Sequence, residues 1–288
     1  MKKSYQVAGH KFSVTMPDGS SMWNEMGQYE PFLSDESGEH VFEVTLVDEV
    51  PSMEGWNKVT EEKERFFPVF EFYESNEGWL WTLSQEDDLE AKSYLMCDKA
   101  FSKARLCFVG KSRAFLHNML SFMFAASTAN RNTLMIHSSV TLHEGKGYLF
   151  LGKSGTGKST HSQLWIKNIE GCELLNDDHP VLKVENDGTV YVYGSPWSGK
   201  TPCYRNFSAP VGAVVDLHQA PKNAIWRQKI YEAYGSVFKS FSGFRFIKEC
   251  ADGFHATNER IVTTVPFYSL DCLPDAEAAW LCFNTVAQ

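Results

Sequence analysis

The chain has 288 residues, of which 43% are apolar and 14% are aromatic. This length suits one large domain or two modest ones, and the apolar content excludes a disordered chain because it is enough for a buried core. The formal charge of −9 is unevenly spread: residues 1–100 carry 8 basic and 21 acidic side chains, and residues 101–288 carry 19 and 15. We therefore expect a strongly acidic N-terminal part and a mildly basic remainder that suits a small phosphorylated ligand.

Charge and hydropathy also exclude two classes of partner. The chain has no run of five Lys or Arg residues, and its acidic part would repel phosphate backbones, so we expect no nucleic acid. We expect no membrane span, because no stretch of about 18 apolar residues occurs. The seven cysteines are odd in number and include no Cys-x-x-Cys pair, which favours a reducing compartment and a cytoplasmic protein.

Short aromatic and β-branched runs dominate the N-terminal part, separated by clusters of Pro, Gly, Asp and Ser. The runs cover residues 7–16, 40–47, 65–73, 79–83 and 94–96. This spacing predicts a smaller, mainly antiparallel β module in residues 1–110.

Helical and strand patterns mix in residues 111–288, which predicts an α/β domain there. We expect helices at residues 113–130, 159–169, 224–241 and 276–286. We expect strands at residues 133–142, 147–151, 172–175, 181–184, 190–193 and 211–217. The first two of these strands are predicted to form a hairpin or a close pair.

A glycine-rich turn between a predicted strand and a predicted helix satisfies the phosphate-loop pattern G-x-x-x-x-G-K-[ST]. Its glycines let successive backbone N–H groups point at phosphate oxygens, and the helix N-terminus adds partial positive charge. Lys158 would reach the β- and γ-phosphates of ATP, and the Ser159 hydroxyl would bind Mg²⁺. The predicted nucleotide-binding residues are Gly152, Lys153, Ser154, Gly155, Thr156, Gly157, Lys158, Ser159 and Thr160.

Two other glycine motifs fail at this turn. A nucleophile elbow around Ser154 would need glycine where Thr156 stands. A dinucleotide-binding fingerprint that starts at Gly155 would need glycine where Thr160 stands.

Two consecutive aspartates, Asp177 and Asp178, follow the apolar pair Leu174-Leu175. Carboxylates at the end of a strand beside a phosphate loop are suited to holding the metal ion and to orienting or deprotonating an attacking hydroxyl. We predict Mg²⁺ ligation by Ser159, Asp177 and Asp178, and we leave open which aspartate takes which role.

Histidines and a second turn complete the candidate site. His137 lies in an apolar strand, where a histidine is either a satisfied core residue or a catalytic group, and His179 directly follows the aspartates. The turn-rich segment 193–200 is either a surface loop or a loop that closes over substrate. In the second case Ser198, Gly199, Lys200 and Arg205 would form the substrate loop, with its cations near the transferred phosphoryl group.

The stretch from His137 through the phosphate loop and Asp177-Asp178 to Val184 resembles the catalytic domain of bacterial HPr kinase/phosphorylase, whose phosphate loop is of the same class as that of phosphoenolpyruvate carboxykinase. A looser likeness covers residues 113–288 and is greatest for the HPr-kinase-like group found beside biosynthetic clusters. The resemblance implies an HPr kinase/carboxykinase-like P-loop fold for residues 111–288 and a catalytic role for His137. Thr160 follows Ser159 as in carboxykinases, but those enzymes are nearly twice this length, so we reject carboxykinase activity.

The leading hypothesis is an ATP- and Mg²⁺-dependent serine kinase, in which Asp178, His137 and Lys158 are catalytic. The acceptor would be a hydroxyl of a peptide, a protein or a free amino acid, and the acidic module would select or dock it. The alternatives are a nucleotide-binding regulatory protein that transfers no phosphoryl group, and a simple NTPase. The oligomeric state stays open, a homo-oligomer included.

Overall fold

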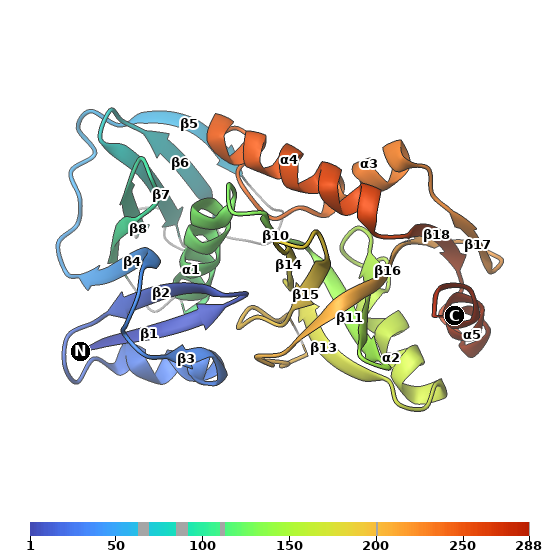
Figure 1. Ribbon diagram of the computed structural model, residues 1–288. Coiled ribbons are helices and arrows are strands. Elements are labelled where there is room, and N and C mark those ends of the chain that lie inside the picture. The colour runs from blue at the N-terminus through green and yellow to red at the C-terminus, as the bar shows by residue number, and fades with distance from the viewer. Residues whose placement is uncertain (63–68, 85–91, 110–112, 200, 288) are drawn as a thin grey trace. The chain divides into compact units, whose positions relative to one another are not determined.

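The computed structural model describes residues 1–62, 69–84, 92–109, 113–199 and 201–287 (Figure 1). The chain forms two compact units, Met1–Ser127 and Thr128–Gln288, and each is described by itself. The predicted boundary between residues 110 and 111 lies outside the described residues. Each unit combines a large β-sheet with helices, so the chain is of mixed α/β type.

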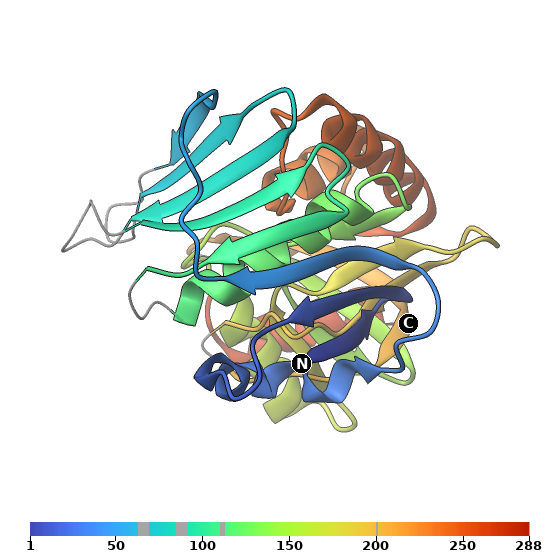
Figure 2. The same cartoon turned by 90° about the vertical axis from the view of Figure 1, so that its left-hand side faces the viewer.

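The first unit is built on a nine-stranded sheet whose strands Figure 2 shows lying alongside one another. The order across the sheet is β3-β1-β2-β4-β9-β8-β7-β6-β5. Two neighbouring pairs, β2–β4 and β4–β9, are parallel, and the other described pairs are antiparallel. The strands are β1 (Lys2–Val7), β2 (His10–Thr15), β3 (Leu33–Ser34), β4 (His40–Val47), β5 (Asn57–Glu62), β6 (Phe70–Glu74), β7 (Gly78–Ser84), β8 (Lys92–Asp98) and β9 (Lys103–Cys107).

Aromatic side chains form much of the core of this unit. The ring of Phe12 stacks on that of Phe42 at 4.7 Å and meets Phe124 of helix α1 (Arg113–Thr128) edge-on at 6.3 Å. A 3₁₀ segment, η1 (Ser21–Phe32), adds Tyr29, whose ring lies 6.5 Å from Phe12. Because α1 packs here, it belongs to the first unit. From the sequence pattern we expected this helix to be part of the second unit.

The strand predictions for the first unit hold for 40–47, 79–83 and 94–96, within two residues at each end. The run 7–16 is wrong as one strand, because the chain reverses at Ala8-Gly9, where both φ angles are positive (50° and 80°), and forms the β1–β2 hairpin. The run 65–73 lies partly outside the described residues, and its described end is in β6.

The second unit contains a mixed nine-stranded sheet with the order β10-β14-β15-β16-β12-β11-β13, to which β18 and β17 are added beside β16. Strand β12 is parallel to β16, which is parallel to β18, and β11 lies antiparallel between β12 and β13. The strands are β10 (Thr133–Met135), β11 (Ser138–His143), β12 (Lys146–Leu151), β13 (Glu173–Asp178), β14 (Val181–Val184), β15 (Val190–Tyr193), β16 (Ser208–Gln219), β17 (Ala224–Arg227) and β18 (Phe267–Cys272).

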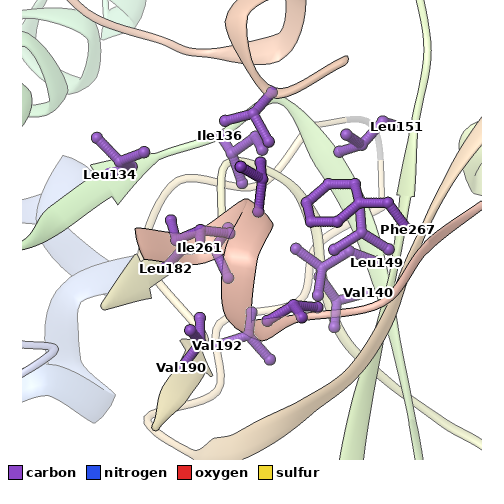
Figure 3. Packing of buried hydrophobic residues seen from close by; sticks show 14 of the residues in the cluster. Leu134, Ile136, Val140, Leu149, Leu151, Leu182, Val190, Val192, Ile261 and Phe267 are labelled. Carbon is purple, nitrogen blue, oxygen red and sulfur yellow. The ribbon is translucent and has the colours of Figure 1, made fainter. Parts of the chain in front are cut away.

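Helices cover both faces of this sheet. Helices α3 (Ile230–Ser240) and α4 (Lys248–Thr264) pack on the cluster that contains Leu149, Leu151 and Val214 (Figure 3). Helices α2 (Lys158–Asn168) and α5 (Ala276–Val286) pack on the opposite face, where Trp165 is fully buried. Each face therefore has its own apolar core.

Two sequence expectations for the second unit need correction, and one helix was missed. The run 133–142 is not one strand, because it breaks at Ile136-His137 between β10 and β11. The run 224–241 is helical only from Ile230, because Ala224–Arg227 forms strand β17 on the edge of β18. Helix α4 was not among the predicted elements, and it contains Gly253 near its middle. A Cβ at Gly253 would lie 2.3 Å from the Ala129 carbonyl oxygen, so the close approach of the chain there requires glycine.

The structure adds two observations on the helices and the cysteines. None of the described helices is both long and apolar enough to cross a membrane. All seven cysteines lie in the described parts and are unpaired.

Candidate nucleotide site

The phosphate-loop sequence connects the end of β12 to the start of α2. Gly152, Gly155 and Gly157 have φ angles of 142°, 81° and 110°, values that side chains with a Cβ rarely adopt. Gly157 is the N-cap of α2 and provides no side-chain cap, so the N–H groups of the first helical turn point out of the helix end. A Cβ at Gly155 or Gly157 would meet nothing within 4 Å, which leaves open space above the loop. This arrangement suits an anion.

Lys158 starts helix α2 and is buried. Its ammonium nitrogen lies 3.0 Å from the Gly152 carbonyl oxygen and 2.9 Å from Nε2 of His137. Burial lowers the pKa of Lys158 and outweighs the opposite effect of Asp178 and Asp177. Because an ammonium group only donates hydrogen bonds, His137 accepts at Nε2, and its proton then lies on Nδ1.

Ser159 and Asp177 meet across the start of α2. The Ser159 hydroxyl donates to Oδ1 of Asp177 at 2.9 Å. Asp177 is buried and lies in β13, next to Ser139 of β11 in the sheet register. The pair thus presents hydroxyl and carboxylate oxygens beside the phosphate loop, which are ligands that Mg²⁺ prefers.

Asp178 lies between two imidazole rings. Nδ1 of His137 is 2.9 Å from its Oδ1, and Nδ1 of His179 is 3.0 Å from its Oδ2. Burial alone would raise the pKa of Asp178, but the hydrogen bonds and charges of the two histidines more than offset this and hold the pKa well below its usual range. Asp178 is therefore ionised at neutral pH.

The two aspartates point to opposite faces of the sheet, because successive side chains in a strand alternate. Asp177 faces α2 and the phosphate loop, whereas Asp178 faces His137. The backbone N–H of His137 donates to the carbonyl of Ser240, which connects His137 to the end of α3. From the sequence we expected both residues after a strand that ends at residue 175. They are in fact its last two residues, so the strand pairing itself separates their side chains.

The segment Ser195–Gly199 packs directly on the aspartates. Gly199 N donates to the Asp177 carbonyl at 2.8 Å, His179 N donates to the Trp197 carbonyl at 3.3 Å, and Ser198 forms an antiparallel bridge with Asp178. Ser195 and Trp197 are buried. Residues 195–197 are therefore buried beside the aspartates, whereas Gly199 at the end of the segment is exposed.

The remaining residues of the predicted substrate loop lie elsewhere. Lys200 is outside the described residues. Arg205 forms an ion pair with Glu173 at 3.0 Å and donates to the Leu174 carbonyl at 2.7 Å, which places its guanidinium at the start of β13, away from the aspartates at its end. The structure thus brings Ser198 and Gly199 to Asp177 and Asp178 and does not bring Arg205 there.

Two further residues belong to the local structure of the site and were not selected from the sequence. Gln219, at the end of β16, donates from Nε2 to the Gly155 carbonyl at 3.1 Å and to that of Thr156 at 3.4 Å. Asn176 precedes the aspartates and is fully buried. Gln219 follows an apolar parallel strand beside the phosphate-loop strand, a position at which polar side chains gather in α/β sheets, so the pattern held a usable signal. Asn176 gave none.

A second group of side chains has the composition of a metal site. Ligand atoms of His137, Asp178 and His179 lie within 4.8 Å of one another. Two imidazoles and one carboxylate suit a transition metal better than Mg²⁺, which prefers oxygen ligands alone. The oxygens of Ser159 and Asp177 are thus the better fit to Mg²⁺ of the two groups.

Comparisons with known proteins add little to this geometry. No protein-family model matches the chain, and no curated protein matches it. Among solved structures, the HPr(Ser) kinase/phosphatase from Coxiella burnetii is similar, with 14% sequence identity and a TM-score of 0.33 over 53% of this chain and 88% of that one. A likeness at this level says nothing about function, so the function has to be inferred from the site itself.

Proposed function

We propose that this chain is an ATP- and Mg²⁺-dependent phosphotransferase that phosphorylates a hydroxyl, a serine of a peptide or protein or a free amino acid. The observation that carries the proposal is a pair of adjacent carboxylates. Asp177 accepts a hydrogen bond from Ser159 of the phosphate loop, and Asp178 lies between two histidines, 2.9 Å from Nδ1 of His137. A phosphate loop with a metal carboxylate is enough to bind nucleotide. A second carboxylate near Lys158 is suited to the acceptor hydroxyl.

The nucleotide would be held by the backbone N–H groups of residues 152–160 and by Lys158, as the open loop and the uncapped start of α2 support. Ser159 and Asp177 would bind Mg²⁺, which when bound neutralises charge on the β- and γ-phosphates. Lys158, which is within reach of both the loop carbonyls and His137, would turn from the carbonyls to the γ-phosphate.

Asp178 would orient the acceptor hydroxyl and take its proton as the hydroxyl oxygen bonds to the γ-phosphorus and ADP leaves. Its low pKa makes it a weak base, which suits phosphoryl transfer because little charge develops on the attacking oxygen in a loose transition state. His137 and His179 would hold the carboxylate in place through their Nδ1–H groups. The catalytic roles proposed for Asp178, His137 and Lys158 thus have a geometric basis, with His179 added.

A nucleotide-binding regulatory protein without transfer activity is the second candidate. The feature that favours it is the pair of hydrogen bonds from Gln219 to the phosphate-loop carbonyls. A change of the loop on nucleotide binding would alter these bonds and so affect the end of β16. A regulator has no need for Asp178 between two histidines, and for this reason we place it second.

The test is a transfer assay with γ-labelled ATP, Mg²⁺ and a panel of serine, serine-containing peptides and cell lysate. We expect label on an acceptor with the wild-type chain, and a loss of at least about 1,000-fold in Asp178→Asn, with ATP affinity unchanged within about threefold. Asp187→Asn is the matched control, because Asp187 is an exposed turn residue whose change removes the same charge. Tight ATP binding with neither transfer nor hydrolysis by the wild-type chain would contradict the phosphotransferase proposal and favour the regulatory protein.

A further inference from the structure

The segment Ser195–Gly199 and the buried Asn176 form one hydrogen-bonded unit around the aspartates. Nδ2 of Asn176 lies 3.2 Å from the Ser195 hydroxyl, 3.3 Å from the Ser195 carbonyl and 3.4 Å from the Trp197 carbonyl. The Ser195 hydroxyl in turn donates to the His179 carbonyl at 2.6 Å. Asn176 and Ser195 are each 0% exposed, so these bonds are made away from water, where they are strong and where leaving them unmade is costly.

These bonds involve the residues that directly precede and follow the two aspartates in the sequence. Asn176 precedes Asp177, His179 follows Asp178, and both are tied to the same segment. Gly199 completes the enclosure, because a Cβ there would lie 3.2 Å from the Asp177 carbonyl oxygen and 3.3 Å from Cβ of Asp178, tighter than side chains normally pack. The backbone of Asp177 and Asp178 is thus held between β11 on one side and Ser195–Gly199 on the other.

The side-chain amide of Asn176 is hydrogen-bonded only through its nitrogen. Its carbonyl oxygen Oδ1 is buried and has no hydrogen-bond partner among the described residues, which lowers the stability of the fold. Asn258 in α4 offers the same combination: it is fully buried, its Nδ2 donates to the Tyr234 carbonyl at 3.3 Å, and its Oδ1 is unpaired among the described residues.

We propose that Asn176 and Ser195 are positioning residues that act through Ser195–Gly199 to fix the backbone of Asp177 and Asp178, so that one carboxylate is held in place for the metal and the other for the acceptor hydroxyl. This inference rests on the proposed phosphotransferase function. In this proposal Ser195–Gly199 is a brace, that is, a hydrogen-bonded support for the backbone of the two aspartates. Displacements of about 1 Å at a reacting group lower rates by about 100-fold, so the brace contributes to the rate without touching a reactant.

The test compares Asn176→Ala, Ser195→Ala, the double variant and Asn258→Ala as matched control. We expect each of the first two to lower kcat for phosphoryl transfer by about 10- to 100-fold, with KM for ATP changed by less than about threefold. The double variant should be no worse than the more damaged single variant by more than about threefold, because both substitutions break one brace. Asn258→Ala should lower Tm to a similar extent and leave kcat within about threefold.

A second readout is hydrogen exchange at the backbone amides of His179 and Gly199, which bond to Trp197 and Asp177. Exchange there should be at least about tenfold faster in Asn176→Ala than in wild type and unchanged in Asn258→Ala. Unchanged exchange in Asn176→Ala, wild-type kcat in that variant, or an equal loss of kcat in Asn258→Ala would each overturn the proposal. A wild-type chain without transfer activity would instead overturn the kinase, while the exchange rates would still decide whether Asn176 holds the aspartates.

Discussion

At the residue scale, the phosphate loop depends on glycine at Gly157 for backbone conformation alone. A Cβ there would meet no atom within 4 Å, but the φ angle of 110° is one that only glycine adopts readily. Gly235 in α3 is also open, yet it lies in an ordinary helix interior. Because neither glycine has an atom within 4 Å of an added Cβ, a comparison of the two isolates the effect of backbone conformation.

Alanine should have opposite effects at these two glycines. We expect Gly157→Ala to lower the free energy of unfolding by about 1–2 kcal/mol or more, since it forces an alanine into a strained conformation, and to weaken ATP binding. Gly235→Ala should raise it by about 0.5–1 kcal/mol, because alanine favours the helix. Urea unfolding and ATP titration of both variants measure this. Stabilisation by Gly157→Ala would mean that the loop does not hold this conformation in solution.

The residue scale is also where the sequence was most informative about the site. The phosphate loop could be predicted because its eight residues are contiguous and their pattern has a local physical reason. The pairing of His137 with Asp178 joins residues 41 positions apart through adjacent strands β11 and β13, and no local pattern encodes that register. Asn176 could not be found at all, because a buried asparagine in a strand is recognisable only once its partners in Ser195–Gly199 are known.

At the scale of elements, one carboxylate on β6 connects four neighbouring strands of the first sheet. Glu71 accepts hydrogen bonds from Lys58 of β5 and Lys92 of β8, each at 2.7 Å, and from Thr82 of β7 at 3.1 Å. Burial raises the pKa of Glu71, but these hydrogen bonds and that of Tyr73 outweigh burial and lower the pKa to about 2 from 4.5. Glu71 thus stabilises the folded form only while it is ionised.

The sign of the pH effect follows from this lowered pKa. The contribution of Glu71 is fully present above about pH 4.5 and is lost as the pH falls toward about 2. We expect Glu71→Gln to cost on the order of 2 kcal/mol of unfolding free energy near neutral pH, and the gap from wild type to shrink by about 1 kcal/mol between about pH 6 and about pH 3.5. Urea unfolding across this pH range checks it, with Glu74→Gln as control, because Glu74 is about half exposed and pairs with Lys99 alone among the described residues. A gap that does not change with pH would mean that Glu71 is not ionised in this network.

Element boundaries were predictable where a pattern and a terminator coincide. Helix α5 begins at Ala276 as expected, because Asp275 caps it by accepting from the Ala278 N–H at 2.9 Å. The segment Ala224–Arg227 was mistaken for helix because four residues show no distinct period, and its pairing with β18 decides its conformation. Tertiary pairing overrides local preference in such short segments.

At the scale of the whole molecule, the charge division changes once the structural units replace the sequence boundary. Residues 1–127 carry 12 basic and 21 acidic side chains, so their formal charge of −9 equals that of the whole chain. Residues 128–288 carry 15 of each sign. The mild basic excess expected for the phosphate-binding part is therefore absent, because the four cations of residues 101–127 belong to the first unit. The proposed phosphate binding would then depend on the local groups at the loop and not on an excess of basic residues in this unit.

All the residues of the proposed nucleotide site lie in the second unit, which has an apolar core on each face of its sheet. We therefore expect a fragment of residues 128–288 to fold and to bind ATP with an affinity within about threefold of the full chain. Circular dichroism and ATP titration of the fragment measure this, with Lys158→Met in the fragment as the control that should lose binding. A folded fragment that does not bind ATP would show that the first unit contributes to the site.

The equal numbers of acidic and basic groups in the second unit have a practical consequence for its behaviour in solution. A protein without net charge has no long-range repulsion between its copies, and its solubility is lowest near that pH. The second unit alone would be close to this condition at neutral pH, whereas the full chain carries the nine negative charges of the first unit. In the full chain, the net charge of the first unit thus provides an electrostatic repulsion between copies that the second unit alone would lack.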